Sequence, residues 1–285
     1  MLRQGRTFLA AALAVCVAGA ASADPVEGEE LVINGDITLV TRVAPAASVA
    51  DALPEVLSGW LFRDEATRAM EMDDFDNPAM LAVDVGLELW DTVDGSEGKS
   101  CASCHGDISS MKGLRAKLPK MNAAGDDLWS MENFINDCRT NRMGADAWKW
   151  SGSEMTAMTG AISLQSRGMP MSVAIDGPAA EWWAKGKEMY YTRTGQLELS
   201  CANCHEDNYG NHIRADHLSQ GQLSGFPVYR LKNAKLVSIH NRFKGCVRDT
   251  RAETYAEGSP EFRALELYVA SRGEGLSIEG VGVRP

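Results

Sequence analysis

The sequence predicts a mainly α-helical protein that consists of two tandem domains related by internal duplication, preceded by an N-terminal extension. Three observations support this prediction. A five-residue motif, Cys-x-x-Cys-His, occurs twice, at 101–105 and 201–205. Landmark residues around the motif recur at the same spacing. Apolar residues at helical spacing precede the motif and follow it in each copy.

The first 23 residues have the features of a secretory signal peptide. Arg3 and Arg6 form a basic start, 8–20 is an apolar core, and Ala21-Ser22-Ala23 is a small-residue cleavage site. A membrane anchor would need about 20 apolar residues, and this run is shorter. We therefore expect cleavage after about Ala23 and a periplasmic protein without membrane insertion.

The charge balance argues against nucleic-acid binding. The chain has 28 Lys and Arg residues against 39 Asp and Glu residues, a formal net charge of −11. Cleavage of the signal peptide would remove two more positive charges, Arg3 and Arg6. Such a surface repels the phosphate backbone, so we expect no nucleic-acid partner.

Residues 24–75 have no counterpart in the repeat and form the predicted N-terminal extension. Residues 32–41 alternate weakly between apolar and polar side chains, which is typical of a short strand or hairpin. We expect this extension to pack on the first domain.

The two copies of the motif, CASCH and CANCH, have the attachment signature of c-type haem. The two thiols of each motif can form thioethers, and the histidine can then bind the iron. A redox disulfide would not need the histidine, and a zinc site would need four ligands close together. The sequence therefore predicts two covalently attached haem c groups. The attaching cysteines and proximal histidines are Cys101, Cys104 and His105 in the first motif, and Cys201, Cys204 and His205 in the second.

The repeat extends on both sides of each motif. Upstream, 76–79 matches 176–179, and Gly86 matches Gly186 at the same offset. Downstream, each copy has a lone cysteine and then a predicted closing helix, at 155–168 and 262–273. Each copy has the same order: a helix, the motif, an irregular segment, a lone cysteine and a closing helix. This is the order of the cytochrome c fold. We therefore predict cytochrome-c-like domains at 76–175 and 176–285.

The sixth iron ligand is open on the residues alone, because methionine, histidine and cysteine are all available. His105 is the only histidine before residue 205, so the first haem has no second histidine within its own domain. Histidines that compete for the second haem are His212, His217 and His240. Methionines near the first haem, most of them expected in the core, are Met111, Met121, Met131, Met143, Met155, Met158, Met169 and Met171.

Cys138 and Cys246 form a matched pair, since each occurs once per repeat downstream of its motif. A cytochrome c usually places its distal ligand there, and thiolate is a good donor to ferric haem. Two alternatives remain: the two cysteines could form a disulfide with each other, or they could be inert buried thiols.

A basic cluster surrounds Cys246 in the sequence HNRFKGCVRDTRAE, residues 240–253. It comprises Arg242, Lys244, Arg248 and Arg251. Nearby cations lower the pKa of a thiol and attract small anions. A plain solvated face is the alternative. If the cluster binds substrate, Lys244 and Arg248 are candidate contacts besides Arg242.

Two Cys-x-x-Cys-His motifs, each followed by a lone cysteine, together with RFKGCVRDTRAE, resemble the SoxA family of c-type cytochrome subunits. The resemblance covers nearly the whole predicted mature chain. It implies that His105 and Cys138 ligate the first haem, and that His205 and Cys246 ligate the second. It further implies that Cys246 is the catalytic cysteine, carried as a persulfide, and that Arg242 is the active-site arginine.

The resemblance also implies an activity and partners. Such a subunit is an L-cysteine S-thiosulfotransferase, which oxidatively joins thiosulfate to a cysteine of the carrier protein SoxY. It forms a heterodimer with a monohaem cytochrome, SoxX, which accepts the electrons. Three other functions compete: a dihaem thiosulfate dehydrogenase that makes tetrathionate, a plain electron-transfer cytochrome, and a dihaem peroxidase.

Overall fold

The computed structural model describes residue 25 and residues 29–214 and 216–285. The predicted signal peptide, 1–23, lies outside these residues. None of the helices in the described part of the chain is long and apolar enough to cross a membrane.

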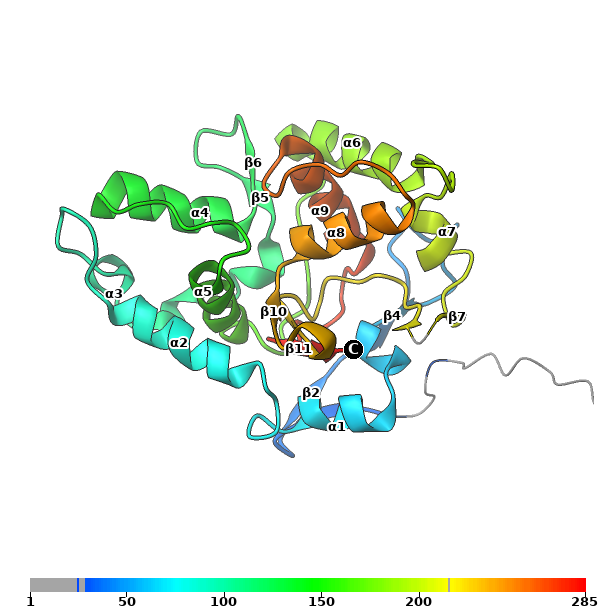
Figure 1. The fold of residues 1–285 in the computed structure, drawn as a ribbon, viewed down its shortest axis with the longest axis horizontal. Helices are drawn as coiled ribbons and strands as arrows, with labels where there is room; N and C mark the ends of the chain where they lie inside the picture. Colours follow the sequence, from blue (N-terminus) through cyan, green and yellow to red (C-terminus); the bar gives the residue numbers. More distant parts are fainter. Residues whose placement is uncertain (1–24, 26–28, 215) are drawn as a thin grey trace, which may run out of the picture.

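Each half of the molecule contains four α-helices in the predicted order, and the two sets lie side by side (Figure 1). In the first half these are α2 (Met80–Asp91), α3 (Cys101–His105), α4 (Met131–Cys138) and α5 (Ser153–Leu164). In the second half they are α6 (Ala180–Tyr191), α7 (Cys201–His205), α8 (Ile239–Asp249) and α9 (Pro260–Arg272). The prediction of a mainly helical, duplicated fold is confirmed, and both predicted closing helices are present as α5 and α9.

The first and last helices of each half cross at a matched glycine. A Cβ atom on Gly86 would lie 2.2 Å from the carbonyl oxygen of Ala157, and one on Gly186 would lie 2.0 Å from that of Ala264. No side chain fits at such distances, so α2 can approach α5, and α6 can approach α9, only because glycine is present. The repeated glycine identified in the sequence thus fixes the same helix crossing twice.

The motif helices α3 and α7 are short and begin with matching caps. Ser100 and Ser200 each accept a hydrogen bond from the backbone N–H three residues on. The Ser103 hydroxyl and the Asn203 side-chain oxygen in turn accept a hydrogen bond from the backbone N–H of the capping serine, which completes a capping box. Each motif therefore starts at a fixed turn, with its histidine at the helix end.

The N-terminal extension forms two small hairpins and a helix. β1 (Leu31–Ile33) pairs antiparallel with β2 (Ile37–Leu39), which confirms the predicted hairpin. β3 (Arg42–Val43) pairs with β4 (Val56–Leu57). A 3₁₀ helix at Gly59–Phe62 leads into α1 (Glu65–Met72).

The extension also contacts the second half, although we predicted that it packs on the first domain. The backbone N–H of Leu57 donates to Gln220 Oε1 at 2.9 Å, and the Arg63 guanidinium donates to the carbonyl of His217 at 2.7 Å. Its main tie to the first half is the ion pair of Asp74 with Arg167 at 2.8 Å. The expectation that it packs on the first domain is therefore corrected: it bridges both halves, because its polar groups find partners in second-half loops.

A three-stranded sheet at the centre was not predicted. β9 (Val228–Arg230) pairs antiparallel with β10 (Lys235–Val237) and parallel with the C-terminal strand β11 (Gly282–Arg284). In Figure 1 this sheet lies between α8 and the extension. Two further pairs of two-residue strands are β5 (Lys120–Met121) with β6 (Leu128–Trp129), and β7 (His212–Ile213) with β8 (Asp216–His217).

One buried apolar cluster contains residues of both halves. Leu128 and Met171 of the first half belong to the same buried cluster as Phe262 and Leu267 of the second. The boundary at 175/176 stays a prediction, and these contacts indicate that the halves are packed together rather than separated by a linker.

Candidate haem and thiol site

His205 ends helix α7 with one ring nitrogen engaged and the other available. Nδ1 lies 2.7 Å from the carbonyl oxygen of Ser219, which can only accept, so Nδ1 carries the proton and Nε2 is left as a ligand atom. Gly221, at a φ of +74°, lets this loop approach closely, since a Cβ there would lie 3.0 Å from the imidazole. The loop therefore sets the tautomer that a proximal iron ligand needs.

The Cys246 thiol lies against His205. Cys246 is on α8, which begins after the capping residue Ser238, and its thiol is close enough to the imidazole for the two groups to affect each other's ionisation. The Cys201 and Cys204 thiols are also close enough to Cys246 to interact electrostatically. The structure therefore brings the second motif and the lone cysteine of that repeat together, as predicted from their positions in the repeat.

The surroundings of Cys246 favour the thiolate. Burial alone would raise the pKa of the thiol, but the Arg242 guanidinium and the His205 imidazole outweigh it and lower the pKa to about 7. Arg242 precedes Cys246 by one helical turn on the same face of α8. The thiolate in turn raises the pKa of Arg242.

A second arginine near this thiol was missed by the sequence analysis. Arg230, on β9, is 7% exposed and close enough to interact with both Cys246 and Arg242. Its Nε atom is buried without a hydrogen-bond partner in the described part of the chain. Burial and the nearby arginines Arg284, Arg230 and Arg242 lower the pKa of Arg63 to about 9. Arg230 lies sixteen positions before Cys246, with strand β10 and the start of α8 between them, so no spacing rule connects the two.

Lys244 and Arg248 are not placed at the thiol. Lys244 pairs with Glu257 at 3.5 Å, and Arg248 is exposed and donates to the carbonyl of Lys244. Neither contributes to the lowered pKa of Cys246. Both lie on another face of α8 than Arg242 and Cys246, and their role in substrate binding stays a prediction.

The first repeat has an equivalent but differently charged arrangement. Cys138 lies at the end of α4, close enough to interact with Cys101 and Cys104. His105 is exposed, with its ring centroid 5.9 Å from that of Trp90. Burial and the Asp137 carboxylate raise the pKa of the Cys138 thiol, the opposite direction from Cys246.

Several alternatives for the sixth ligand are engaged elsewhere. The His240 imidazole is buried, stacks on Trp150 and bonds to Glu266. His217 lies against His212, and both of its ring nitrogens are within 2.9 Å of backbone carbonyls. All six described cysteines are free, so Cys138 and Cys246 form no disulfide with each other.

These residues fit covalently attached haem. Each repeat presents two thiols on one short helix, a histidine at its end and a third thiol next to the motif. The engaged Nδ1 of His205 leaves a nitrogen donor, and Cys246 supplies a sulfur donor facing it. Imidazole and thiolate are both established axial ligands of haem iron.

Comparison with known proteins gives a consistent result. A family profile described as SoxA/TsdA, cytochrome c domain, matches residues 85–171 and 185–278. The L-cysteine S-thiosulfotransferase subunit SoxA of Paracoccus pantotrophus is 58% identical over 281 residues, covering 98% of this chain and 97% of that protein. The subunit of the same name from Rhodovulum sulfidophilum is 56% identical over 281 residues, covering 97% of each.

A solved structure agrees at the level of the fold. The crystal structure of SoxXA from P. pantotrophus has a chain that matches with a TM-score of 0.90 and 58% identity, covering 92% of this chain and 100% of that one. The two profile matches confirm two cytochrome c domains, and haem c is the cofactor such domains carry. The chain therefore belongs to the SoxA/TsdA cytochrome c family and, within it, to the SoxA subunits of L-cysteine S-thiosulfotransferase.

Proposed function

We propose that this chain carries two haem c groups and oxidatively conjugates thiosulfate to a cysteine of a SoxY-type carrier protein, with Cys246 as the catalytic sulfur. One observation carries the proposal. Cys246 faces His205 and lies next to two arginines, and its pKa is lowered to about 7 although the thiol is desolvated. A structural thiol in a core has no need of such cations.

Arg242 and Arg230 provide the anion site. Thiosulfate is a dianion, and guanidinium groups bind oxyanions through charge-assisted hydrogen bonds. Arg230 has a buried donor without a partner among the described residues, so an arriving anion would satisfy it. We therefore assign the contacts with thiosulfate to Arg242 and Arg230, whereas the sequence suggested Lys244 and Arg248 besides Arg242.

The overall reaction balances without further reactants except an electron acceptor. The S–H bond of the carrier cysteine breaks, a sulfur–sulfur bond to the terminal sulfur of thiosulfate forms, and one proton and two electrons are released. Bound haem supplies the redox chemistry. The protein's own residues bind the anion, hold the Cys246 sulfur as thiolate or persulfide, and orient His205 through Ser219.

A relative supports the inferred partner, and the sequence supports the inferred compartment. Because a solved relative is described as SoxXA, we infer a monohaem SoxX-type partner that forms a heterodimer with this chain and accepts the electrons. The signal-peptide pattern of residues 1–23 supports export to the periplasm. The ligand sets we infer are His105 with Cys138, and His205 with Cys246.

Matched substitutions of the two lone cysteines test this function. With thiosulfate, SoxY and the partner present, we expect Cys246→Ala to abolish conjugation, while Cys138→Ala retains most of it. The mass of SoxY, measured after a fixed time, reports the added thiosulfate. Full conjugation by Cys246→Ala would refute the role of this residue. Tetrathionate production without any carrier protein would instead establish a thiosulfate dehydrogenase.

A further inference from the structure

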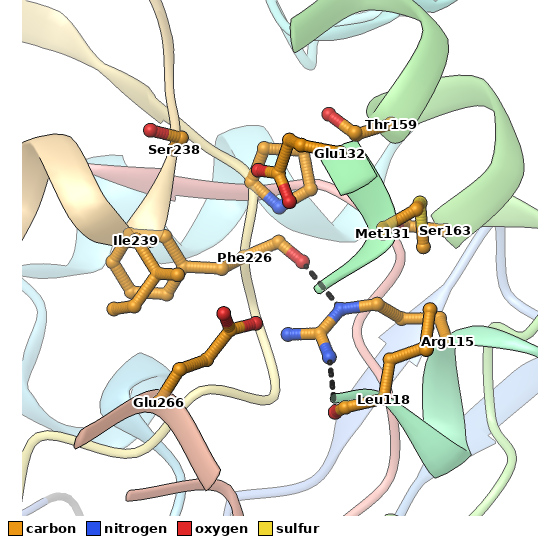
Figure 2. Close-up of a pocket in the computed structure, with 11 residues that line it drawn as sticks. Arg115, Leu118, Met131, Glu132, Thr159, Ser163, Phe226, Ser238, Ile239 and Glu266 are labelled. Carbon is orange, nitrogen blue, oxygen red and sulfur yellow. Dashed lines mark hydrogen bonds between the residues drawn. The ribbon is translucent and has the colours of Figure 1, made fainter. Parts of the chain in front are cut away.

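A small cavity lies between the two cytochrome domains, away from Cys246. Its volume is about 30 Å³, enough for one water molecule. Glu132 of α4 and Glu266 of α9 both line it, opposite Arg115, as Figure 2 shows. The Ser163 hydroxyl also lines it and is fully buried without a hydrogen-bond partner among the described residues. The cavity thus holds two buried carboxyls, one guanidinium and a hydroxyl without a partner among the described residues.

The duplication makes this cavity the meeting point of both ligand-bearing helices. Glu132 precedes Cys138 by six residues on α4, and His240 precedes Cys246 by six residues on α8. Each helix follows a matched serine, Ser130 or Ser238. The equivalent positions therefore hold a carboxyl in one repeat and an imidazole in the other, and both groups face the Glu266 carboxyl.

The hydrogen bonds of His240 show that it is neutral. Its Nδ1 accepts the backbone N–H of Gly258 at 2.9 Å, so this nitrogen carries no proton. Its Nε2 lies 3.1 Å from Glu266 Oε2 and donates to it. The ring is fully buried between Trp150, at a stacked distance of 4.9 Å, and Phe262. His240 therefore adds no positive charge to the cavity.

Arg115 is the cation that faces the two carboxyls. Its guanidinium donates to three backbone carbonyls, those of Phe226, Leu118 and Leu223, at 3.2–3.3 Å. Arg263, one turn from Glu266 on α9, is paired with Asp127 and the carbonyl of Leu128. The side chains that line the cavity from α5 and from the 226–227 loop are uncharged. Two buried carboxyls thus share one available cation.

Glu132 and Glu266 differ in the hydrogen-bond donors that reach their carboxyl groups. Glu266 accepts hydrogen bonds from the Ser130 hydroxyl and from His240. Against the effect of burial, these two bonds and the Arg115 guanidinium favour the ionised form of Glu266 and lower its pKa. Glu132 has no side-chain donor in the described part of the chain. Burial and the nearby Glu266 charge raise the pKa of Glu132 to about 7.

We propose that this interdomain cavity is a redox-linked proton-binding site, in which Glu132, next to an ionised Glu266, is protonated when a haem is reduced and gives the proton up when the haem is oxidised. Reduction of a haem adds one electron to a domain whose ligand-bearing helix begins at the cavity. Extra negative charge in a low-dielectric interior favours the neutral carboxyl, so Glu132 takes up one proton from solvent. Oxidation returns the electron to the acceptor and the proton to solvent. The inference requires bound haem but does not depend on the thiosulfate chemistry.

Infrared spectroscopy of the haem-loaded protein tests the site without an activity assay. The reduced-minus-oxidised difference spectrum near pH 7 should contain the carbonyl stretch of a protonated carboxylic acid. Glu132→Gln should remove this signal, because the amide cannot bind the proton. Glu88→Gln, which removes an exposed carboxyl from α2, is the matched control and should leave it unchanged. Unaltered visible spectra would show that the variants keep their haems.

A second variant gives an independent outcome. Glu266→Gln removes the neighbouring negative charge, so Glu132 should ionise near neutral pH and its signal should reappear only at lower pH. A carboxylic-acid signal that is absent from the wild type, or that persists in Glu132→Gln, would overturn the proposal. Glu266→Gln also tests the proposal if Glu132→Gln loses its haems. A carboxylic-acid signal in Glu266→Gln with the same pH dependence as in the wild type would then overturn the proposal.

Discussion

The two lone cysteines occupy equivalent positions in the repeats, but neighbouring charges give their thiols different acidity. Arg242 and His205 lower the pKa of Cys246 against the effect of burial, whereas burial and Asp137 raise the pKa of Cys138. The sequence predicted the thiol at Cys246 from its place in the repeat, and Arg242 from the basic cluster and the family resemblance. It could not predict Arg230, because strand β9 brings that residue to the thiol only in the folded chain.

Arg230 and Arg242 should both be needed to bind the anionic substrate. We expect Arg230→Gln and Arg242→Gln each to lower kcat/KM for thiosulfate about ten- to hundred-fold, since a hydrogen bond to a charged group contributes about 1.5–3 kcal/mol. Steady-state rates at varied thiosulfate concentration, with SoxY and the partner subunit in excess, measure this effect.

Arg248→Gln is the matched control for those variants. Arg248 is exposed and lies on another face of α8, so kcat/KM should stay within about twofold, as for other exposed charges. An equal loss in Arg248→Gln would show that general surface charge, rather than the arginine pair, attracts the substrate. Unchanged kinetics in Arg230→Gln would remove Arg230 from the site.

At the scale of the elements, periodicity and repeat landmarks predicted the helices well and the strands poorly. Helices α2 and α6 contain the matched glycines, and the repeated Ser-Arg-Gly landmark marks the C-terminal ends of α5 and α9, so the repeat identifies all four. Strands β9, β10 and β11 have three residues each, too few for an alternation pattern, and β11 pairs with a strand more than fifty residues away in the chain. Such long-range pairing leaves no local signal.

The matched glycines offer a direct test of the helix crossings. Gly86→Ala and Gly186→Ala should each destabilise the protein by about 1–3 kcal/mol or more, because the added methyl group would overlap a backbone carbonyl. Urea unfolding followed by circular dichroism gives the free energy of unfolding.

Gly245→Ala is the counterpart that separates steric overlap from a general effect of glycine replacement. Gly245 lies within helix α8 with no atom within 4 Å of an added Cβ. Alanine there should stabilise the helix by about 0.5–1 kcal/mol. Destabilisation of all three variants by the same amount would refute the account of the crossings.

At the scale of the whole molecule, the extension and the C-terminal strand tie the two domains together, which the sequence did not indicate. Arg284 of β11 pairs with Glu71 of α1 at 2.6 Å and with Glu279. Both carboxyls are 1% exposed. Burial raises the pKa of Glu71 to about 8. Buried ion pairs of this kind join segments that are distant in sequence, and composition alone cannot identify the partners.

Arg284→Met should therefore destabilise the protein by about 3–5 kcal/mol near neutral pH, because it leaves the buried Glu279 carboxylate, next to Glu71, without its cation. The loss should shrink as the pH falls, since protonated carboxyls need no counter-charge. Unfolding free energies of the variant and the wild type, compared at pH 5 and pH 8, measure this. A loss that is the same at both pH values would contradict the role of the charges.

The central claim is that Cys246 is the sulfur-handling residue of this molecule. The most direct measurement is the mass of the peptides containing Cys246 and Cys138, under non-reducing conditions, before and after thiosulfate is added with the partner subunit present. We predict an additional sulfur or a thiosulfate-derived adduct on Cys246 and an unmodified Cys138. An unmodified Cys246 thiol throughout would contradict the account and leave an electron-transfer cytochrome as the better description.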